Sequence, residues 1–281
     1  MSAGRIVVVG TPIGNLGDLS PRAREALAGA DVVFCEDTRR TRKLFSAVGI
    51  PAPRLVALHQ HNEAAASLRA VSLAAAGTSV VVVTDAGMPG ISDPGERLVG
   101  LAAVEGVPVD IVPGPAAFLV ALVGSGLPTG RFCFEGFLPR RGRERRLRLE
   151  SIAAESRTSV LYEAPHRVVA TLADLGGACG SDRRIAVGRE LTKLHEQFWR
   201  GTLDEAAAWV GDNEPRGEWV IVVDGATPRD PSCIGEDEIT SALSERLKSG
   251  MTKRAAAEEV AAELGLPRRR VYELSLIATR D

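Results

Sequence analysis

The sequence predicts an α/β protein with two α/β domains, followed by a small C-terminal helical segment. Short apolar runs rich in β-branched residues alternate with longer amphipathic stretches up to about residue 223. These runs lack polar alternation, which is typical of strands buried on both faces of a parallel sheet with helical crossovers. With 281 residues, of which 45% are hydrophobic and 25% charged, the chain has enough apolar material for two cores.

The first half of the chain predicts four strands and three helices. We expect the strands at Arg5–Val9, Val32–Cys35, Ser79–Thr84 and Val109–Val112. We expect the helices at Pro21–Gly29, Asn62–Ala76 and Pro94–Val104. Ser20 and Pro21 support the first helix, because serine caps helix N-termini and proline is favoured at the first helical position.

The second half predicts a further set of strands and helices. The strands are expected at Phe132–Gly136, Ser159–Tyr162, Arg184–Val187, Gln197–Gly201 and Trp219–Val223. The helices are expected at Arg143–Glu155, His166–Leu175 and Leu203–Val210. Between the two sets, residues 124–130 contain three glycines and a proline, which is typical of a break between domains. We therefore predict domains at 1–124 and 125–225.

The C-terminal region predicts a linker at 226–234 and a helical tail at 235–281. The tail has helical patterns at Glu236–Lys248, Thr252–Leu264 and Arg268–Ile277, with a break at Gly265 to Pro267. Two helices joined by a short glycine-containing turn form the helix-turn-helix pattern of many DNA-binding proteins. The nearly balanced charge of residues 252–276 favours the alternative, a helical cap that stabilises the fold or a dimer.

Composition excludes several classes of protein. The formal net charge of −2 provides no global positive field, so any nucleic-acid surface must be local. No apolar run approaches the roughly 20 residues that span a bilayer, and the first apolar run is too short for a signal peptide. The four scattered cysteines have no metal-ligand spacing and indicate reduced thiols. We expect a soluble cytoplasmic protein without a metal site or a membrane partner.

Three loops rich in glycine and proline follow predicted strands, at Gly10–Asn15, Thr84–Gly95 and Pro113–Ala117. Open α/β sheets bind ligands beyond the carboxyl ends of their strands, so these loops predict a binding site. None of them matches a dinucleotide-binding or phosphate-binding fingerprint. The middle loop packs three glycines, two prolines and two aspartates into twelve residues, more than a helix cap at Asp93 requires.

Eight motifs carry a family resemblance: GTPIGNLGDLS, CEDTRRTRKL, TDAGMPGISDPG, VPGPAA, FEGFLPRR, LYEAPHR, GRELTKLHE and GEWVIVV. Together, over roughly residues 4–225, they resemble the tetrapyrrole methylase superfamily. More narrowly, they resemble its branch that methylates the ribose 2′-oxygen of a cytidine in 16S ribosomal RNA. The resemblance implies a homodimer with S-adenosylmethionine (SAM) folded in a cleft between its two α/β domains, and the 30S ribosomal subunit as partner. The cofactor-binding residues that it implies are Thr11, Pro12, Ile13, Asp85, Gly87, Met88, Pro89, Ser92, Asp93, Ala116, Ala117, Leu161 and Tyr162.

Methylation of a ribose hydroxyl needs orientation together with a base or a cation beside the developing alkoxide. Around the acceptor we expect Glu36, Asp37, Arg39, Glu163, His166 and Lys193. Each has a plainer interpretation. The segment from Glu36 to Arg39 is also a suitable helix cap, and His166 is also suited to begin a helix. Lys193 belongs to a set with Arg189 and Glu196 that would form a solvated charge ladder if helical.

A run of basic residues follows the predicted strand at Phe132–Gly136. Residues 139–148 contain six arginines and one acid. Arginine suits phosphate because its planar fork binds two oxygens, although charge runs are often only solvated surface. The predicted RNA-binding residues are Arg140, Arg141, Arg143, Arg145 and Arg146.

Two other functions remain open from the sequence. One is methylation of a small corrin or porphyrin precursor, which would need neither the basic run nor the helical tail. The other is a non-catalytic regulator that binds nucleic acid through the C-terminal helices and does not bind SAM.

Overall fold

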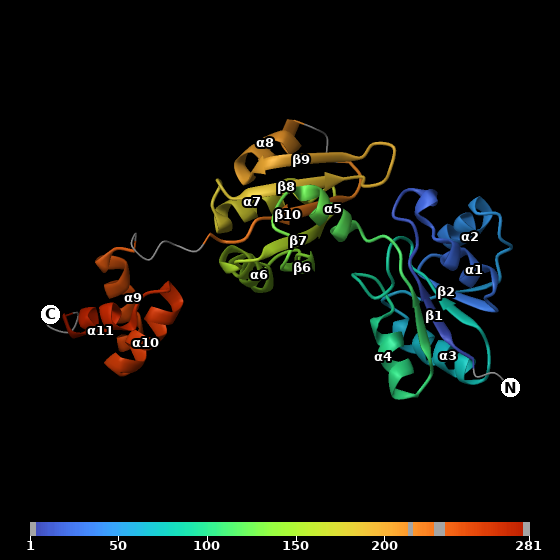
Figure 1. The fold of residues 1–281 in the computed structure, drawn as a ribbon, viewed down its shortest axis with the longest axis horizontal. Coiled ribbons are helices and arrows are strands. Elements are labelled where there is room, and N and C mark those ends of the chain that lie inside the picture. Colours follow the sequence, from blue (N-terminus) through green and yellow to red (C-terminus); the bar gives the residue numbers. More distant parts are fainter. Residues whose placement is uncertain (1–3, 213–215, 228–233, 278–281) are drawn as a thin grey trace. The chain divides into compact units, whose positions relative to one another are not determined.

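The computed structural model describes residues 4–212, 216–227 and 234–277. The chain divides into two compact units, Met1–Ala226 and Thr227–Asp281 (Figure 1). Among the described residues, the first unit contains two five-stranded sheets, and the second contains three helices. Most of the predicted linker at 226–234 lies outside the described residues. Within the described ranges, no helix is long and apolar enough to cross a membrane.

The first sheet is entirely parallel, with strand order β3-β2-β4-β1-β5. Its strands are β1 (Ile6–Val9), β2 (Val32–Cys35), β3 (Arg54–Ala57), β4 (Val80–Val82) and β5 (Val109–Val112). Its helices are α1 (Pro21–Ala28), α2 (Thr38–Ala47), α3 (Glu63–Ala75) and α4 (Glu96–Val104), and a 3₁₀ turn, η1, spans Leu16–Asp18.

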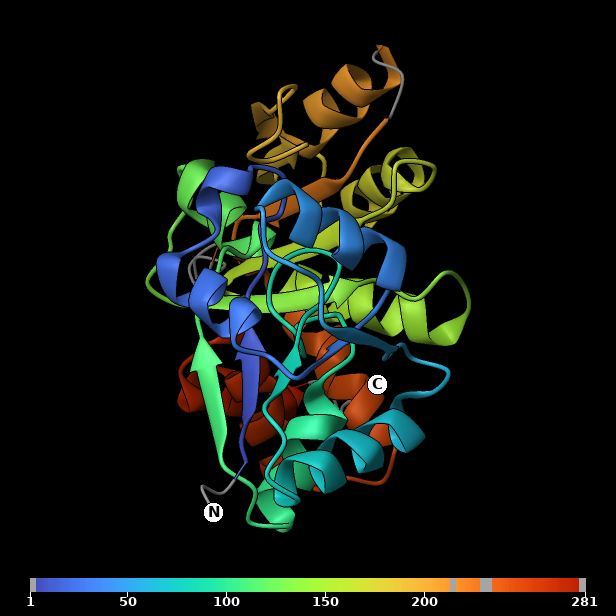
Figure 2. The same ribbon diagram turned by 90° about the vertical axis from the view of Figure 1, so that its right-hand side faces the viewer.

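Helices cover both faces of this sheet (Figure 2). Alternate strand residues point to opposite faces. Ile6 and Val8 therefore pack with α3 and α4, whereas Val7 and Val9 pack with α1 and α2. Burial on both faces explains why these strands carry uninterrupted apolar runs.

The second sheet is mixed, with strand order β6-β7-β10-β8-β9. Its strands are β6 (Phe132–Phe137), β7 (Thr158–Glu163), β8 (Arg184–Arg189), β9 (Gln197–Thr202) and β10 (Trp219–Val223). Only β6 and β7 pair in parallel. The helices α6 (Arg143–Ala154), α7 (Val168–Cys179) and α8 (Leu203–Asp212) cover one face, and α5 (Ala117–Ser125) covers the other. The predicted α/β fold class is confirmed, although this second sheet is not the parallel sheet that unbroken apolar runs suggested.

The carboxyl ends of the first sheet's strands bring three loops together. The backbone groups of Thr11 and Gly87 exchange two hydrogen bonds, at 2.9 and 3.1 Å. Gly10 and Gly114 pack so closely that a β-carbon on Gly114 would lie 2.7 Å from the Cα atom of Gly10. Only glycine fits at this contact, so the loops after β1 and β5 can meet only with these two residues.

Three helices form the second unit: α9 (Glu236–Lys248), α10 (Lys253–Leu264) and α11 (Arg268–Ile277). They agree with the predicted helices to within a residue. The Thr252 hydroxyl caps α10 by accepting from the Ala255 N–H, and Gly265 ends it with a φ of 63°. Ile239, Leu243, Val260 and Val271 form a small core of their own.

Candidate active site

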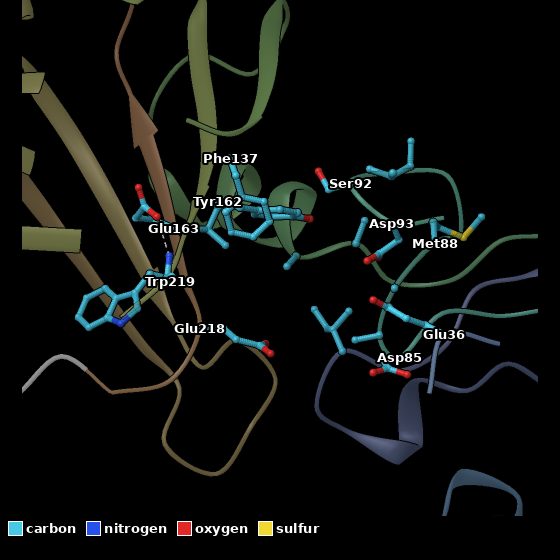
Figure 3. A pocket seen from close by; sticks show the side chains of 18 of the residues that line it. Glu36, Asp85, Met88, Ser92, Asp93, Phe137, Tyr162, Glu163, Glu218 and Trp219 are labelled. Carbon is cyan, nitrogen blue, oxygen red and sulfur yellow. Dashed lines mark hydrogen bonds between the residues drawn. The ribbon is translucent and has the colours of Figure 1, made fainter. Parts of the chain in front are cut away.

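A cavity of about 380 Å³ lies between the ends of the two sheets of the first unit (Figure 3). Its walls from the first sheet's side are Ile13, Glu36, Arg40, Asp85, Ala86, Gly87, Met88, Ile91, Ser92, Asp93, Ala116 and Ala117. Its walls from the second sheet's side are Phe137, Tyr162, Glu163, Ala164, Pro165, Glu218, Trp219 and Val220. Such a volume falls within the range of small-molecule sites.

Most of the predicted cofactor-binding residues line this cavity. They are Ile13, Asp85, Gly87, Met88, Ser92, Asp93, Ala116, Ala117 and Tyr162. The other four do not line it. Pro12 and Pro89 lie in the same loops, and Thr11 is buried, with its hydroxyl 3.3 Å from the Thr84 carbonyl oxygen. Leu161 packs in the core on the opposite face of β7 from Tyr162, because neighbouring strand residues point to opposite faces.

Besides Glu163, which is paired with Arg167, four carboxylates line the cavity and give it a negative interior: Glu36, Asp85, Asp93 and Glu218. Asp85 is partly balanced, because it accepts the Asp37 N–H at 3.0 Å and lies 3.3 Å from the Arg40 guanidinium. Burial, and then the charges of Glu36, Asp85 and Glu218, raise the pKa of Asp93 to about 7. Burial followed by Asp85 likewise raises the pKa of Glu36. A positively charged ligand would relieve this repulsion.

Asp37 and Arg39 lie outside the cavity and form a helix cap. Asp37 is the N-cap of α2 and accepts the Arg39 N–H at 2.7 Å. Its other carboxylate oxygen accepts from the Arg39 guanidinium at 2.9 Å, and these side-chain bonds hold the pKa of Asp37 at about 2. Arg40, one residue further along α2, lines the cavity instead. The plainer interpretation of Asp37 and Arg39 as a cap therefore accounts for their contacts.

Glu163 and His166 lie at the junction between β7 and α7. The Glu163 side chain is fully buried, and its carboxylate accepts the Ala164 N–H at 2.8 Å and the Thr171 hydroxyl at 2.6 Å. The Arg167 guanidinium lies 3.3 Å away. With three partners this carboxylate holds the end of the strand against the helix. His166 is exposed in the turn before α7 and does not line the cavity.

Lys193 does not line the cavity itself, but it forms an ion pair with Glu218, which does. Its Nζ atom lies 2.8 Å from Glu190 and 3.0 Å from Glu218. Burial lowers the pKa of Lys193, but the hydrogen bonds to the two glutamates outweigh this effect and raise it. Residues 190–196 form a turn between β8 and β9, which excludes the helical charge ladder. The Lys193 stem packs directly against Gly14, where no larger residue would fit.

The arginine run separates into two groups. Arg140, Arg141, Arg143 and Arg146 are exposed at the start of α6. Arg145 is only 9% exposed, and its guanidinium donates to Asp174 at 2.7 Å, to Thr171 at 3.0 Å and to the Pro139 carbonyl at 3.0 Å. Its donors are thus occupied within the protein, so Arg145, unlike the four exposed arginines, is not available to bind a phosphate.

A profile of the tetrapyrrole (corrin/porphyrin) methylases matches residues 5–207 of the chain. The chain belongs to this family. It is 45% identical to a Synechocystis protein named ribosomal RNA small subunit methyltransferase I, over 99% of both chains. A Mycobacterium tuberculosis protein of the same name is also 45% identical, over 100% of this chain and 98% of its own.

Solved structures of tetrapyrrole methylases share the fold. A cobalt precorrin-4 methyltransferase superposes with a TM-score of 0.60 and 19% identity, covering 78% of this chain and 94% of its own. Uroporphyrin-III C-methyltransferase from Thermus thermophilus, complexed with S-adenosylhomocysteine, gives a TM-score of 0.57 and 22% identity, covering 78% and 97%. The chain is thus a methyltransferase, and its methyl donor is SAM.

The cavity of this tetrapyrrole methylase fits that donor. SAM carries a sulfonium and an ammonium group, and the four carboxylates offer negative charge to both. Ile13, Met88 and the Tyr162 ring line the cavity with apolar surface, which is of the kind that a flat adenine requires. The Tyr162 hydroxyl already accepts the Phe118 N–H at 3.2 Å, so this ring is fixed in place.

Nine of the residues that line the cavity were not predicted from the sequence, and among them are the charged residues Arg40 and Glu218 and the aromatic residue Phe137. Arg40 directly follows the predicted residue Arg39 in α2. The two differ only in the side of the helix from which their side chains project. Glu218 lies within the motif GEWVIVV, directly before a buried strand, so its position was available as a signal. The orientation of Phe137 depends on a register shift in β6 between Phe134 and Gly136, which no sequence pattern predicts.

Proposed function

We propose that this protein transfers the methyl group of SAM to the ribose 2′-oxygen of a cytidine in 16S ribosomal RNA. Identity of 45% along the whole chain to proteins named ribosomal RNA small subunit methyltransferase I carries the proposal. That match includes the C-terminal helices. The tetrapyrrole-methylating structures described above cover only 78% of the chain, which favours RNA over a corrin or porphyrin precursor.

In this proposal SAM occupies the cavity and supplies an activated methyl group. Asp85, Asp93 and Glu218 would balance its positive charges, and Tyr162 would pack near the adenosine. Placing the donor between two rigid sheets serves orientation, which is the main contribution that a protein can make to an in-line displacement.

Glu36 is the carboxylate that we propose to accept the proton of the 2′-hydroxyl. It lines the cavity, and burial raises its pKa, which increases its affinity for a proton. Glu163 is less suited to this role, because its carboxylate already has three partners. Lys193 remains charged beside Glu218 and would stabilise negative charge that develops on the acceptor oxygen.

The RNA backbone would lie along the exposed arginines Arg140, Arg141, Arg143 and Arg146. The carboxylates of the cavity would repel phosphates, so the acceptor nucleotide would present its ribose to the cavity and keep its phosphates outside.

We further propose a cytoplasmic homodimer. Leu119 and Val123 on α5 are large apolar residues with 44% and 77% of their surface exposed, and they are the expected contacts.

Incubation with radiolabelled SAM and one of three acceptors tests the function: 30S subunits, free 16S ribosomal RNA or a uroporphyrinogen. We expect label in the RNA, recovered after nuclease digestion as 2′-O-methylcytidine. Label on the tetrapyrrole, on a nucleobase or on another nucleoside would contradict the proposal. Failure to bind SAM, with nucleic-acid binding by residues 234–281 alone, would favour the regulator instead.

A further inference from the structure

Phe137 is an aromatic residue at the mouth of the cavity with 52% of its surface exposed. A single exposed apolar residue needs no explanation in itself. Phe137, however, ends a row of aromatic rings that leads from the core to the mouth. The ring centroids of Phe134 and Tyr162 are 5.1 Å apart. Those of Tyr162 and Phe137, which Figure 3 labels, are 5.5 Å apart. Phe134 and Tyr162 are partly buried, whereas Phe137 is open to solvent.

A β-bulge puts Phe137 on this face of the sheet. Phe134 pairs with Val160, but the register then shifts, so that Gly136 pairs with Leu161 and Phe137 with Tyr162. Regular alternation would turn Phe137 toward the helices α6 and α7. The extra residue reverses this orientation, and Leu138 points into the α6 and α7 core instead. Bulges of this kind commonly re-aim a side chain beside an active site.

The bulge also meets the opposite wall of the cavity. Gly136 has a φ of 60°, and a β-carbon on it would lie 3.3 Å from the Ser92 hydroxyl oxygen. Ile91, next to Ser92, lines the same cavity and is 41% exposed. The mouth therefore carries an apolar side chain on each side, whereas its interior is acidic.

The neighbouring charges indicate what this ring receives. Arg140, Arg141 and Arg143 follow Phe137 within six residues, and they have no ion-pair partner among the residues that the structure describes. A nucleotide whose phosphates lie on these arginines would place its uncharged base at the mouth. An aromatic side chain can bind an uncharged base by stacking, because every base has a flat π-face.

We propose that Phe137 is the stacking platform for the base of the nucleotide whose ribose is methylated. This inference rests on the proposed RNA acceptor. Stacking on Phe137 would hold the nucleotide out of its own strand and leave the 2′-hydroxyl pointing into the cavity. Phe137 would thus determine the binding of RNA but not that of SAM.

The variants Phe137→Leu and Phe137→Trp test this role on whichever RNA acceptor the wild type methylates. Leucine keeps an apolar side chain but removes the aromatic face. We expect Phe137→Leu to weaken RNA binding and lower kcat/KM by about tenfold to a hundredfold. Phe137→Trp should stay within about threefold of the wild type. SAM affinity, measured by calorimetry, should be unchanged in both variants. Val104→Ala, at an exposed residue of α4, is the control for a general surface effect.

Salt dependence separates stacking from phosphate binding. Phe137→Leu should weaken RNA binding by the same factor at every salt concentration, whereas Arg141→Glu should flatten the salt dependence itself. Equal activity of Phe137→Leu and the wild type would overturn the inference and leave the proposed function intact. A parallel loss of SAM affinity would assign Phe137 to the cofactor, and failure of Phe137→Trp to retain activity would assign it a role in shape; both overturn the inference. A wild type that methylates no RNA overturns both proposals.

Discussion

Asp93 is the residue at which the electrostatics of the cavity are most open to measurement. Its pKa of about 7 means that the folded protein retains this proton to near neutrality, whereas an unfolded chain loses it near pH 4. The contribution of Asp93 to stability is therefore complete below pH 4 and is lost as the pH rises to 7. Above pH 7 the ionised carboxylate destabilises the fold but attracts a positively charged ligand.

Asp93→Asn should consequently become more stable relative to the wild type as the pH rises from 4 to 7. Urea unfolding midpoints of the two proteins across this range measure the effect. A constant difference between the midpoints would show that the pKa of Asp93 is not raised.

The same substitution should weaken SAM binding at pH 8. The affinity of the wild type should fall by up to about tenfold per pH unit below 7, and that of Asp93→Asn should lack this component. The ionisable groups of SAM itself affect both proteins equally. The ratio of the two SAM affinities at each pH therefore reports the titration of Asp93 alone. A ratio independent of pH would contradict the prediction.

Glu36→Gln preserves the shape of a cavity wall and removes the proposed proton acceptor. We expect kcat to fall by about 100-fold to 10,000-fold, the usual contribution of a general base. SAM affinity should change far less, because Asp85, Asp93 and Glu218 remain. Single-turnover methylation and calorimetry check the two quantities, and full activity would exclude Glu36 as the base.

At the scale of elements, helix α6 carries two kinds of arginine. Arg145 is buried and attaches the helix to its neighbours by hydrogen bonds, whereas Arg143 and Arg146 are exposed to solvent. Arg145→Ala removes hydrogen bonds to Asp174, Thr171 and Pro139, and should lower the free energy of unfolding by about 2 kcal/mol. Arg143→Ala should change it by less than about 0.5 kcal/mol, while it weakens RNA binding. Chemical denaturation and RNA titration of both variants test this division; equal stabilities would contradict it.

The elements that the sequence predicted well are those with an unambiguous pattern. Buried apolar strands such as β1 and β2 and the capped helix α1 lie within a residue or so of their expected positions. The prediction missed β3 because it is a short edge strand that is only partly buried, and α5 because it is apolar along its whole length. Neither β3 nor α5 shows the periodicity that distinguishes a strand from a helix. The prediction also gave no helix at α2, although it recognised the segment from Glu36 to Arg39 as a suitable cap.

The candidate site was predictable as loops but not as side-chain directions. The motif after β4 supplied five of the nine predicted cofactor-binding residues that line the cavity. Arg39 and Leu161, by contrast, are each one position away from residues that face it, Arg40 and Tyr162. A helix phase or a strand face decides such cases, and the bulge in β6 shows how a single residue changes the answer.

For the molecule as a whole, a net charge of −2 makes RNA binding depend on one local surface. Reversing Arg140, Arg141 and Arg143 to glutamate should weaken RNA binding. It should also reduce the slope of log K against log salt by about 0.7 for each phosphate of single-stranded RNA that the variant no longer neutralises. SAM affinity should be kept. An unchanged slope would place the RNA elsewhere.

All residues that line the cavity fall between Ile13 and Val220, inside the first unit. A chain that ends at Ala226 should therefore bind SAM with the affinity of the full chain, as calorimetry would show. A large loss would mean that the second unit takes part in the cofactor site. RNA methylation by the shortened chain then measures what the helical tail adds to acceptor binding.

The bulge of β6 has a consequence for how relatives of this protein can diverge. A strand of the same length without the bulge would pair Glu135 with Leu161 and turn over the residues that follow, so that the position of Phe137 faced the helices and that of Leu138 faced the cavity. The chemistry presented to an acceptor is thus set by the register of this strand as well as by residue identity. Among enzymes that share this scaffold, gain or loss of the bulge offers a route to new acceptors that leaves the methyl-donor loops untouched.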